Sequence, residues 1–370
     1  MFSTNPRFSE TNIFWTKTSH YPTHDPKHLS PRPPNTMDKF LVRPKRKAEE
    51  EPATASEDAQ LSSPKKSAKS ETDVDQKTLA EWLSVPVETL TTDQQYEDYF
   101  TGLAERLLNH TVLKVNRQPH RLLEIEFYFT NEKSHGLHYD PFTHCDDIQK
   151  QNAVWYFHRT KGSYRGGTYK GLDITIGRGE GRHGGILIRS VQALQDGKII
   201  CGPSLSVDHL LSVCKAEDIK TLVNEKMQGD ISVFPSEDKS NILVLEDSNN
   251  TFDKKPVYRS GRVGLHMTKK VATDDDKTAQ MDFVFKNYRY FCEAKKISKG
   301  NHYASTALLW RGMSPKEIAN ILPTKLTTIE KYRDLFEEGK KMKEEKFLGT
   351  KMTDSQICQA IGSLHNRLTW

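Results

Sequence analysis

Two carboxylates and a phenol recur at every second position of the segment RLLEIEFYF at 121–129: Glu124, Glu126 and Tyr128. The positions between and beside them are apolar: Leu123, Ile125, Phe127 and Phe129. In a β-strand this alternation places the apolar side chains on one face and the polar ones on the other. Because burying an unpaired carboxylate is costly, the polar face must meet a water-filled cleft or basic partners. Either arrangement indicates a functional site or a sheet edge.

The best internal partner for these acids is Arg189, the sole charge in the apolar segment GGILIRS at 184–190. A guanidinium group can hold a carboxylate through two parallel hydrogen bonds. We therefore expect two strands to bring these charges together. A buried ion pair that joins the strands fits this pattern, and so does a catalytic centre.

Five potential metal ligands crowd the segment SHGLHYDPFTHC at 134–145: His135, His138, Asp140, His144 and Cys145. Their spacing matches no standard zinc pattern, so we expect no metal. A second segment, GRGEGRHGG at 177–185, has the glycines of a phosphate-binding loop. It lies between two predicted strands without a following helix, which favours a hairpin turn.

The length of 370 residues allows one large or two ordinary domains, but 28% of the residues are charged, which indicates that part of the chain joins no core. Residues 1–75 are rich in Pro, Ser, Lys and Glu, so we expect a disordered tail there. Two basic clusters in this tail, RPKRK at 43–47 and PKK at 64–66, predict a nuclear import signal. A solvated run of charges is the alternative.

No segment approaches the roughly 18 consecutive apolar residues of a membrane helix, and the start resembles no secretory signal, so we expect a soluble intracellular protein. The five cysteines include no CxxC pair, which favours free thiols. The net charge of +5 favours a polyanionic partner only mildly.

The segment QKTLAEWL at 76–83 resembles peptides that bind the replication sliding clamp. The matching residues are Gln76, Leu79, Trp82 and Leu83. Such peptides normally end in two aromatic residues, and Leu83 replaces the second. An amphipathic helix packed on the edge of the folded domain is therefore the alternative. MDKFLV at 37–42 matches the clamp motif more weakly.

The folded part is expected to begin near Gln76. Thr92 and Gln95 form a capping box, and apolar residues follow at helical spacing, which predicts a helix over 92–109. Strand-like segments then follow between 111 and 292: GLDITIG, GGILIRS, NILVLE, VYRSGRVGL and FVFKNYRYF. An antiparallel or mixed α+β domain is predicted.

Residues 301–370 return to helical patterns with clear start signals. The capping pairs are Ser314 with Glu317, Thr327 with Glu330, and Thr353 with Gln356. The predicted helices lie near 315–321, 328–343 and 354–367. The first two have roughly the spacing of a helix-turn-helix. Acidic residues on the second would repel phosphates, so a helical cap packed on the main domain is the alternative.

The succession of blocks over about 111–292 resembles the alkyladenine DNA glycosylases, also called 3-methyladenine or methylpurine DNA glycosylases. EIEFY resembles the family's ETEAY block, GLDITIG its strand beside the flipped base, and ILIRSVQAL its LLRALEP block. RVGL and NYRYF resemble its closing RVG and RFY segments. The resemblance implies one mixed antiparallel-sheet domain over 76–300, similar also to the formyltransferase C-terminal domain, with 301–370 as an extension.

In that family the glutamate at the Glu126 position activates the water that attacks the sugar, and the tyrosine at the Tyr128 position stacks on the extruded base. Arg189 matches the arginine that organises water and backbone near this glutamate. The resemblance implies a pocket histidine at His138, or at His135 in another register. The chemistry agrees, because a fixed carboxylate stabilises the oxocarbenium-like state of N-glycosidic cleavage and an aromatic face receives a flipped base.

Two positions depart from the family pattern. Asp173 occupies the place of an asparagine that discriminates against the amino group of guanine, which implies an altered purine preference. The tyrosine that the family inserts into the duplex aligns with Gly166 or Gly167, so Tyr164 or Tyr169 must take over that wedge role. If neither does, single-stranded, mismatched or RNA substrates are favoured.

The resemblance predicts a monomeric, nuclear, monofunctional DNA glycosylase that hydrolyses damaged purines with a water nucleophile and without metal or organic cofactor. One alternative is a noncatalytic nucleic-acid-binding or scaffold protein that holds Glu126 in an ion pair. Another is a glycosylase that acts on single-stranded DNA or RNA.

Overall fold

The computed structural model describes residues 77–132, 138–236, 241–248, 253–269, 273–349 and 351–368. All of them belong to one compact unit. Several sequence predictions concern positions outside this described part: both basic clusters, the weaker clamp-like segment, Gln76 and His135.

An antiparallel sheet of ten strands forms the centre of the described part. Its main path runs β10, β1, β2, β8, β7 and β4, while β12 and β3 pair with β2, β9 pairs with β8, and β11 pairs with β12. The strands of this sheet are β1 (Thr111–Val115), β2 (Gln118–Asn131), β3 (His138–Tyr139), β4 (Asn152–Phe157), β7 (Leu172–Ile176), β8 (Arg182–Ala193), β9 (Ile199–Cys201), β10 (Leu243–Asp247), β11 (Tyr258–Ser260) and β12 (Arg289–Phe291). A separate hairpin joins β5 (Arg159–Thr160) to β6 (Ser163–Tyr164). The predicted α+β class with an antiparallel sheet is confirmed.

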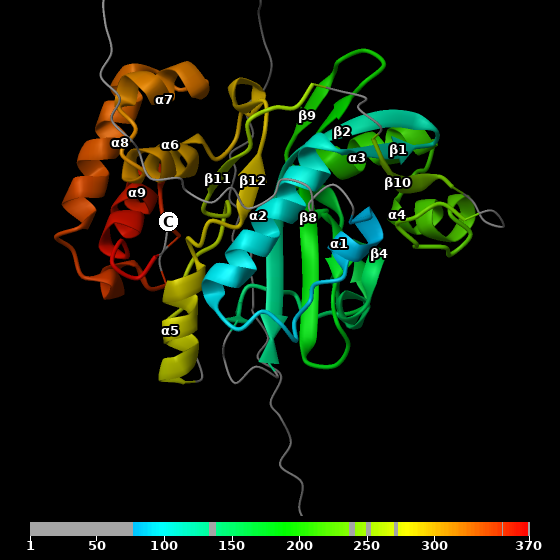
Figure 1. Ribbon diagram of the computed structural model, residues 1–370, viewed down its shortest axis with the longest axis horizontal. Helices are drawn as coiled ribbons and strands as arrows, with labels where there is room; N and C mark the ends of the chain where they lie inside the picture. Colours follow the sequence, from blue (N-terminus) through cyan, green and yellow to red (C-terminus); the bar gives the residue numbers. More distant parts are fainter. Residues whose placement is uncertain are drawn as a thin grey trace, which may run out of the picture. The chain divides into compact units, whose positions relative to one another are not determined.

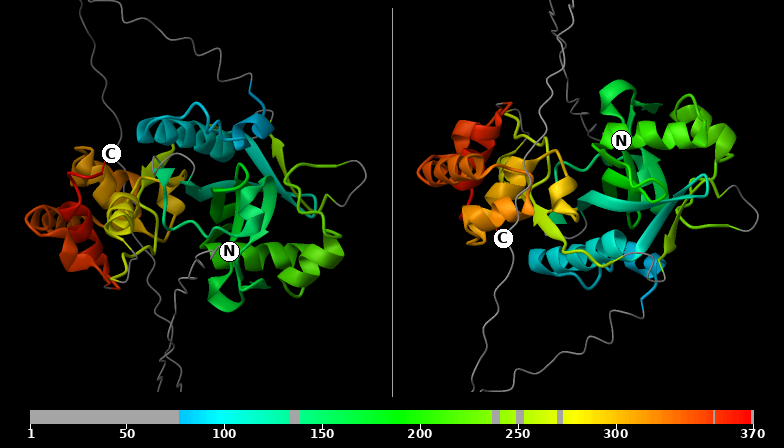
Figure 2. Two further views of the ribbon diagram at one scale, coloured as in Figure 1. Left: turned by 90° about the horizontal axis from the view of Figure 1, so that it is seen from below. Right: turned by 90° about the horizontal axis from the view of Figure 1, so that it is seen from above.

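Helices cover both faces of this sheet. They are α1 (Leu79–Leu83), α2 (Asp93–Asn109), α3 (Pro203–Cys214), α4 (Ile219–Thr221), α5 (Asp274–Phe283), α6 (Asn301–Trp310), α7 (Pro315–Ile321), α8 (Leu326–Gly339) and α9 (Asp354–Ser363). Figure 1 shows α2 crossing in front of β2 and β8. Figure 2 shows α2 on one side of the sheet and α3 on the other.

The strand β2 lies at the heart of the sheet, and its apolar face packs on α2. The ring of Phe100 from α2 stacks on Phe127 from β2 with ring centroids 4.7 Å apart. The capping box of Thr92 and Gln95 starts α2 one residue after the predicted boundary. The alternation seen in the sequence thus becomes a two-sided strand, with α2 on the apolar side.

The clamp-like segment forms the short helix α1 against the folded domain. Leu79 and Leu83 are buried in the main core. Trp82 packs against Tyr99, with ring centroids 5.5 Å apart. A clamp-binding peptide must expose these side chains, so α1 in this fold does not offer the motif, and the amphipathic-helix alternative is confirmed.

Helices α6 to α9 lie beside β11 and β12, at the orange and red end of the chain in Figure 1. Ile318, Leu322 and Ile329 belong to the same apolar core as the sheet residues. The α7–α8 pair therefore packs on the main domain, as the helical-cap alternative expects. The capping boxes at Ser314 and Thr353 are confirmed.

Other sequence predictions need correction. Helix α8 begins at Leu326 after the cap residue Lys325, with no side-chain cap bond, so the predicted start at Thr327 is wrong. In FVFKNYRYF only Arg289–Phe291 forms a strand, because Thr273 caps α5 and this helix runs through Phe283. Helices α3, α5 and α6 were not predicted.

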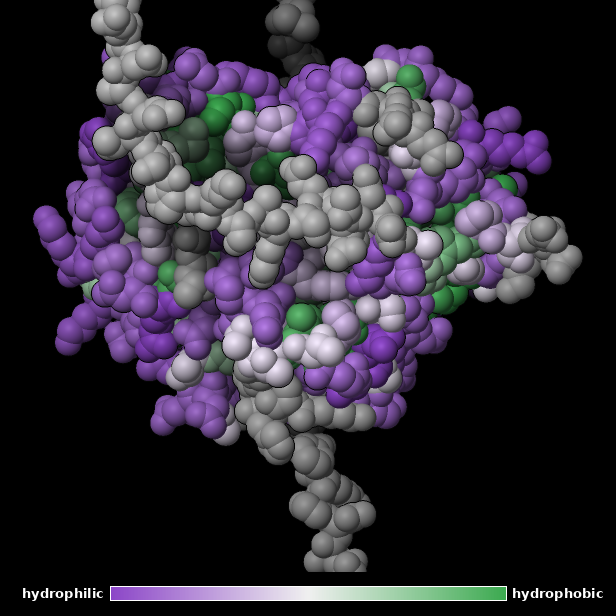
Figure 3. All heavy atoms as spheres, in the orientation of Figure 1, coloured by the Kyte–Doolittle hydropathy of each residue, from purple (hydrophilic) through white to green (hydrophobic). Residues whose placement is uncertain are grey.

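The five cysteines are all free thiols, as predicted. Among the described residues, no helix is long and apolar enough to cross a membrane. The face seen in Figure 3 is mostly hydrophilic, with small separate hydrophobic areas.

Candidate active site

The strand register carries the polar face of β2 across the sheet. Glu126 lies opposite Arg289 on β12 and opposite Leu187 on β8. Leu187 in turn lies opposite Asp173 on β7, which lies opposite Tyr156 on β4. Directly opposed residues of antiparallel strands project to the same face. One row of side chains therefore joins Glu126 to Asp173, two strands and roughly 10 Å away.

Two carboxylates and two guanidinium groups meet under this face and form what we call the buried charge cluster: Glu124, Glu126, Arg189 and Arg289. Arg189 reaches Glu124 at 3.1 Å and Glu126 at 3.2 Å. Arg289 Nε donates to Glu124 at 2.6 Å. All four side chains are at most 6% exposed. The formal charges cancel, which permits their burial. The predicted pairing of Arg189 with the acids of β2 is present.

Every oxygen of Glu126 has a donor, and the side chain is 0% exposed. The backbone N–H of Val263 donates to Oε1 at 2.7 Å. The Tyr128 hydroxyl donates to Oε2 at 2.9 Å, on the same oxygen that Arg189 contacts. The next residue after Val263, Gly264, donates its N–H to the hydroxyl of Tyr303 on α6 at 3.3 Å. The 261–265 segment and α6 therefore close over the carboxylate.

Tyr128 lies at the half-buried edge of this arrangement. Burial and the Glu126 carboxylate raise the pKa of its phenol well above the usual value of 10.0, so the hydroxyl stays protonated and donates. The guanidinium of Arg262 lies 4.5 Å from the centre of the Tyr128 ring. Arg262 is itself held by Asp140, with Nη1 to Oδ2 at 2.5 Å and both side chains fully buried. One face of the tyrosine is thus backed by a fixed cation.

Burial alone would raise the pKa of Glu124, but Arg289 and Arg189 outweigh it and lower the pKa to about 2. The ordinary value is 4.5. Because the folded-state pKa lies below the unfolded one, Glu124 contributes stability above pH 4.5 that is lost as the pH falls toward 2.

We therefore expect the free energy of unfolding to fall by about 3 kcal/mol between these pH values through this one group. Urea unfolding at a series of pH values checks this, with Glu124→Gln removing that part of the pH dependence. Glu345→Gln, an exposed matched change, should leave the profile as it is. A wild-type profile that is flat between pH about 5 and about 2 would contradict the assignment.

His138, the predicted pocket histidine, lies in the core instead. Its Nε2 is 2.8 Å from the Tyr288 hydroxyl and its Nδ1 is 3.1 Å from the Phe129 carbonyl. The ring stacks on Tyr288 and is 4.2 Å from Tyr96, centre to centre. It is 0% exposed. Both nitrogens are used internally, so this histidine braces β3 and does not face a ligand.

A different pair of histidines accompanies Asp173. His158 Nε2 lies 2.7 Å from Asp173 Oδ1, and Gln149 donates to the other carboxylate oxygen at 3.1 Å. His144 is exposed, and its ring centre is 4.4 Å from that of His158. His144 also approaches the Tyr156 hydroxyl at 3.4 Å. The structure therefore brings His144, rather than His138, to the Asp173 side of the row.

Gly185 separates Tyr128 from Asp173. It lies opposite Tyr128 on β8, and a Cβ there would come within 2.5 Å of Asp173 Oδ2. A side chain at this position would displace the aspartate. The second glycine of GGILIRS thus has a local role that the sequence alone did not reveal.

The two wedge candidates differ in freedom. Tyr164 on β6 is half-buried, with Arg159 above its ring at 4.8 Å and bonded to its hydroxyl at 3.1 Å. Tyr169 is 70% exposed at the end of a 3-10 turn. Leu205 is 51% exposed on α3, next to Ser204, which bonds the carbonyl of Gly167 at 2.9 Å. Tyr169 and Leu205 are the exposed large apolar side chains of the described part.

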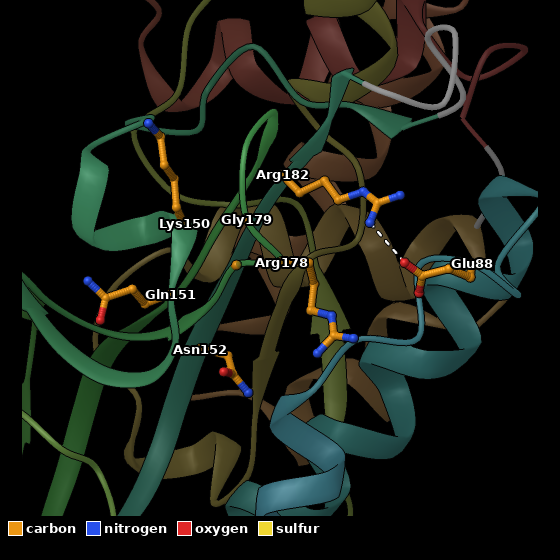
Figure 4. Close-up of a pocket in the computed structure, with 8 residues that line it drawn as sticks. Glu88, Lys150, Gln151, Asn152, Arg178, Gly179 and Arg182 are labelled. Carbon is orange, nitrogen blue, oxygen red and sulfur yellow. Dashed lines mark hydrogen bonds and ion pairs between the residues drawn. The ribbon is translucent and has the colours of Figure 1, made fainter.

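The glycine-rich segment forms the predicted hairpin turn between β7 and β8. The N–H groups of Gly177 and Gly179 bond the carbonyls of Gln151 and Lys150, so they are not available to a phosphate. A polar pocket of about 480 Å³ lies here, lined by Glu88, Lys150, Gln151, Asn152, Gly177, Arg178, Gly179 and Arg182. Figure 4 shows its basic side chains pointing in different directions, with Arg182 bonded to Glu88. It is a basic surface and does not include Glu126.

The fold and the site define an antiparallel α+β protein with a buried charge cluster beside a histidine–aspartate group. No family model matches the sequence. The chain is 36% identical over 193 residues to the uncharacterized protein L759 of Acanthamoeba polyphaga mimivirus, a match that covers 48% of this chain and 84% of the viral protein. The chain belongs to the same family as this viral protein. The relative's name assigns no activity.

Proposed function

We propose that the chain is a glycosylase of the methylpurine type, which hydrolyses the N-glycosidic bond of damaged purines in DNA. The observation that carries the proposal is the position of Glu126. It is held by Arg189 and the Val263 N–H, directly beside Tyr128 at the half-buried edge of the row. A carboxylate fixed by charge-assisted hydrogen bonds is preorganised to orient water and to stabilise developing positive charge.

In the proposed reaction a water oxygen bonds to the sugar C1′ while the bond from C1′ to the purine nitrogen breaks. The bonding electrons leave with the base, and Glu126 accepts the proton of the attacking water. Arg189 holds the carboxylate in place. The extruded base stacks on Tyr128, with its far edge toward Asp173 and His144.

Asp173 would read the base as a hydrogen-bond acceptor, because both of its oxygens already accept from His158 and Gln149. His144 replaces His138 and His135 as the proposed histidine of the pocket, because it is exposed and lies on this side of the row.

The experiment that tests the proposal is base release from oligonucleotides that contain alkylated purines or hypoxanthine, as single strands and as duplexes. Abasic sites that form with wild-type protein, without strand cleavage by the enzyme itself, support a water nucleophile. Salt-sensitive binding to these oligonucleotides without any base release would overturn it.

A second candidate is a noncatalytic nucleic-acid-binding protein, and the complete enclosure of Glu126 favours it. The carboxylate has three donors and no exposed surface, and the charges around it cancel. For catalysis the 261–265 segment and α6 must move to admit water and sugar. Binding without such movement, together with absent base release, identifies this alternative.

Tyr169 is the proposed wedge, because it is exposed and Tyr164 is tied to Arg159. We expect Tyr169→Ala to slow base release from duplex DNA by about 5- to 100-fold, since a stacked base is worth about 1–3 kcal/mol. Release from single strands should stay unchanged, because no wedge is needed there. Single-turnover rates on both substrates check this, with Tyr164→Ala as the matched control. An equal loss on both substrates would contradict a wedge role.

A further inference from the structure

Three side chains that are far apart in the sequence meet at one end of β2 and β8: Glu132, Cys145 and His183. A carboxylate oxygen, the thiol sulfur and an imidazole nitrogen, one from each, all lie within 4.8 Å of one another. Their residues come from the end of β2, from the loop before the 3-10 turn Asp147–Lys150, and from the start of β8. Such a set of one thiol, one imidazole and one carboxylate is the donor chemistry of zinc sites.

The strand register holds two of these residues in place. His183 is paired with Thr130 across β2 and β8. The N–H of Glu132 donates to the carbonyl of Gly181 at 2.8 Å. The backbone that carries the carboxylate and the imidazole is therefore preorganised. A metal would need only side-chain rotation, because Glu132 and Cys145 are both exposed.

The imidazole of His183 gives the independent sign of a ligand. The residue is only 7% exposed, and its Nδ1 is buried without a hydrogen-bond partner in the described part of the chain. A buried polar atom normally has a partner, because leaving it unsatisfied is costly. A metal bound by this side chain, with hydrogen bonding rearranged around the ring, would supply the missing interaction.

The spacing fits a small ion. Zinc bonds of about 2.0–2.3 Å in a tetrahedral arrangement separate the ligand atoms by roughly 3.3–3.8 Å. The observed limit of 4.8 Å therefore closes by about 1 Å on binding. Three protein ligands leave one position of the tetrahedron for water.

We propose that Glu132, Cys145 and His183 bind a zinc-type divalent ion that ties the loop before Asp147–Lys150 to the ends of β2 and β8. This site is separate from the buried charge cluster, and the inference does not depend on the proposed function. The Cys145 thiol loses its proton on binding, and that proton passes to solvent.

The test uses the full chain, stripped of metal with a chelator and titrated with Co²⁺, which reports thiolate ligation by a sulfur-to-cobalt charge-transfer absorption. We expect one thiolate-bound cobalt per chain, displaced by one equivalent of Zn²⁺. The absorption should vanish in Cys145→Ser, and the affinity should fall at least tenfold in His183→Ala and Glu132→Gln. Cys201→Ser, a matched change on β9, should bind as the wild type does.

Absence of the charge-transfer absorption in the wild type would overturn the proposal. So would an absorption that survives Cys145→Ser, because the thiolate would then come from another cysteine. Cys145→Ser changes one atom of an exposed side chain, so its folding can be verified by circular dichroism in the same samples.

Discussion

Glu126→Gln is expected to release damaged bases about 10²- to 10⁴-fold more slowly than the wild type, while it still binds the same oligonucleotides. An amide has the same shape as the carboxylate, and its oxygen still accepts from the Val263 N–H. It cannot take the proton of the attacking water, and it carries no negative charge to stabilise the sugar cation. Single-turnover base release and a separate binding assay measure the two effects.

Glu124→Gln is the matched comparison, since it removes the same charge from the same buried cluster. Glu124 contacts Arg189, Arg289 and Ser190 rather than Tyr128 and Val263. Its variant should lose stability and keep base release within about tenfold of the wild type. If both variants lose activity equally, the cluster acts as a whole through structure, and Glu126 has no special chemical role.

Asp140→Ala is expected to lower the free energy of unfolding by about 3–5 kcal/mol. The change leaves the charge of Arg262 buried without its carboxylate partner, and Arg262 is 0% exposed. Because this guanidinium also backs the Tyr128 ring, the pocket should loosen as well. Urea unfolding at neutral pH measures the loss.

Glu337→Ala is the control for this prediction, since Glu337 pairs with Lys340 on the exposed surface of α8. An exposed pair of this kind contributes about 0–1 kcal/mol. A loss below about 1 kcal/mol in Asp140→Ala as well would show that Arg262 finds other compensation, and the account of the buried pair would be wrong.

The sequence predicted those parts of the fold that local rules control. The period of two in RLLEIEFYF identified a two-sided strand, because one face packs on α2. The capping boxes at Thr92, Ser314 and Thr353 marked helix starts, because they are satisfied within four residues. The pairing of Arg189 with the acids followed from the cost of burying a lone charge.

Features that depend on partners distant in sequence were missed. Arg289 completes the charge cluster from 165 positions away, and nothing near RYF signals that it contacts Glu124. His138 and His144 have similar local surroundings in the sequence, and only the packing of Tyr288 and Tyr96 on His138 separates their roles. The grouping of Glu132, Cys145 and His183 likewise follows from strand register, which single-sequence spacing does not contain.

The central claim, that Glu126 reaches the sugar of a flipped nucleotide, is tested most directly by a crystal structure with an oligonucleotide containing a cationic abasic-site analogue. We expect the C1′ position of the analogue near Glu126, with one water between them and the 261–265 segment displaced from its present place. Nucleic acid bound elsewhere, with Glu126 still enclosed by Arg189 and Val263, would contradict the claim.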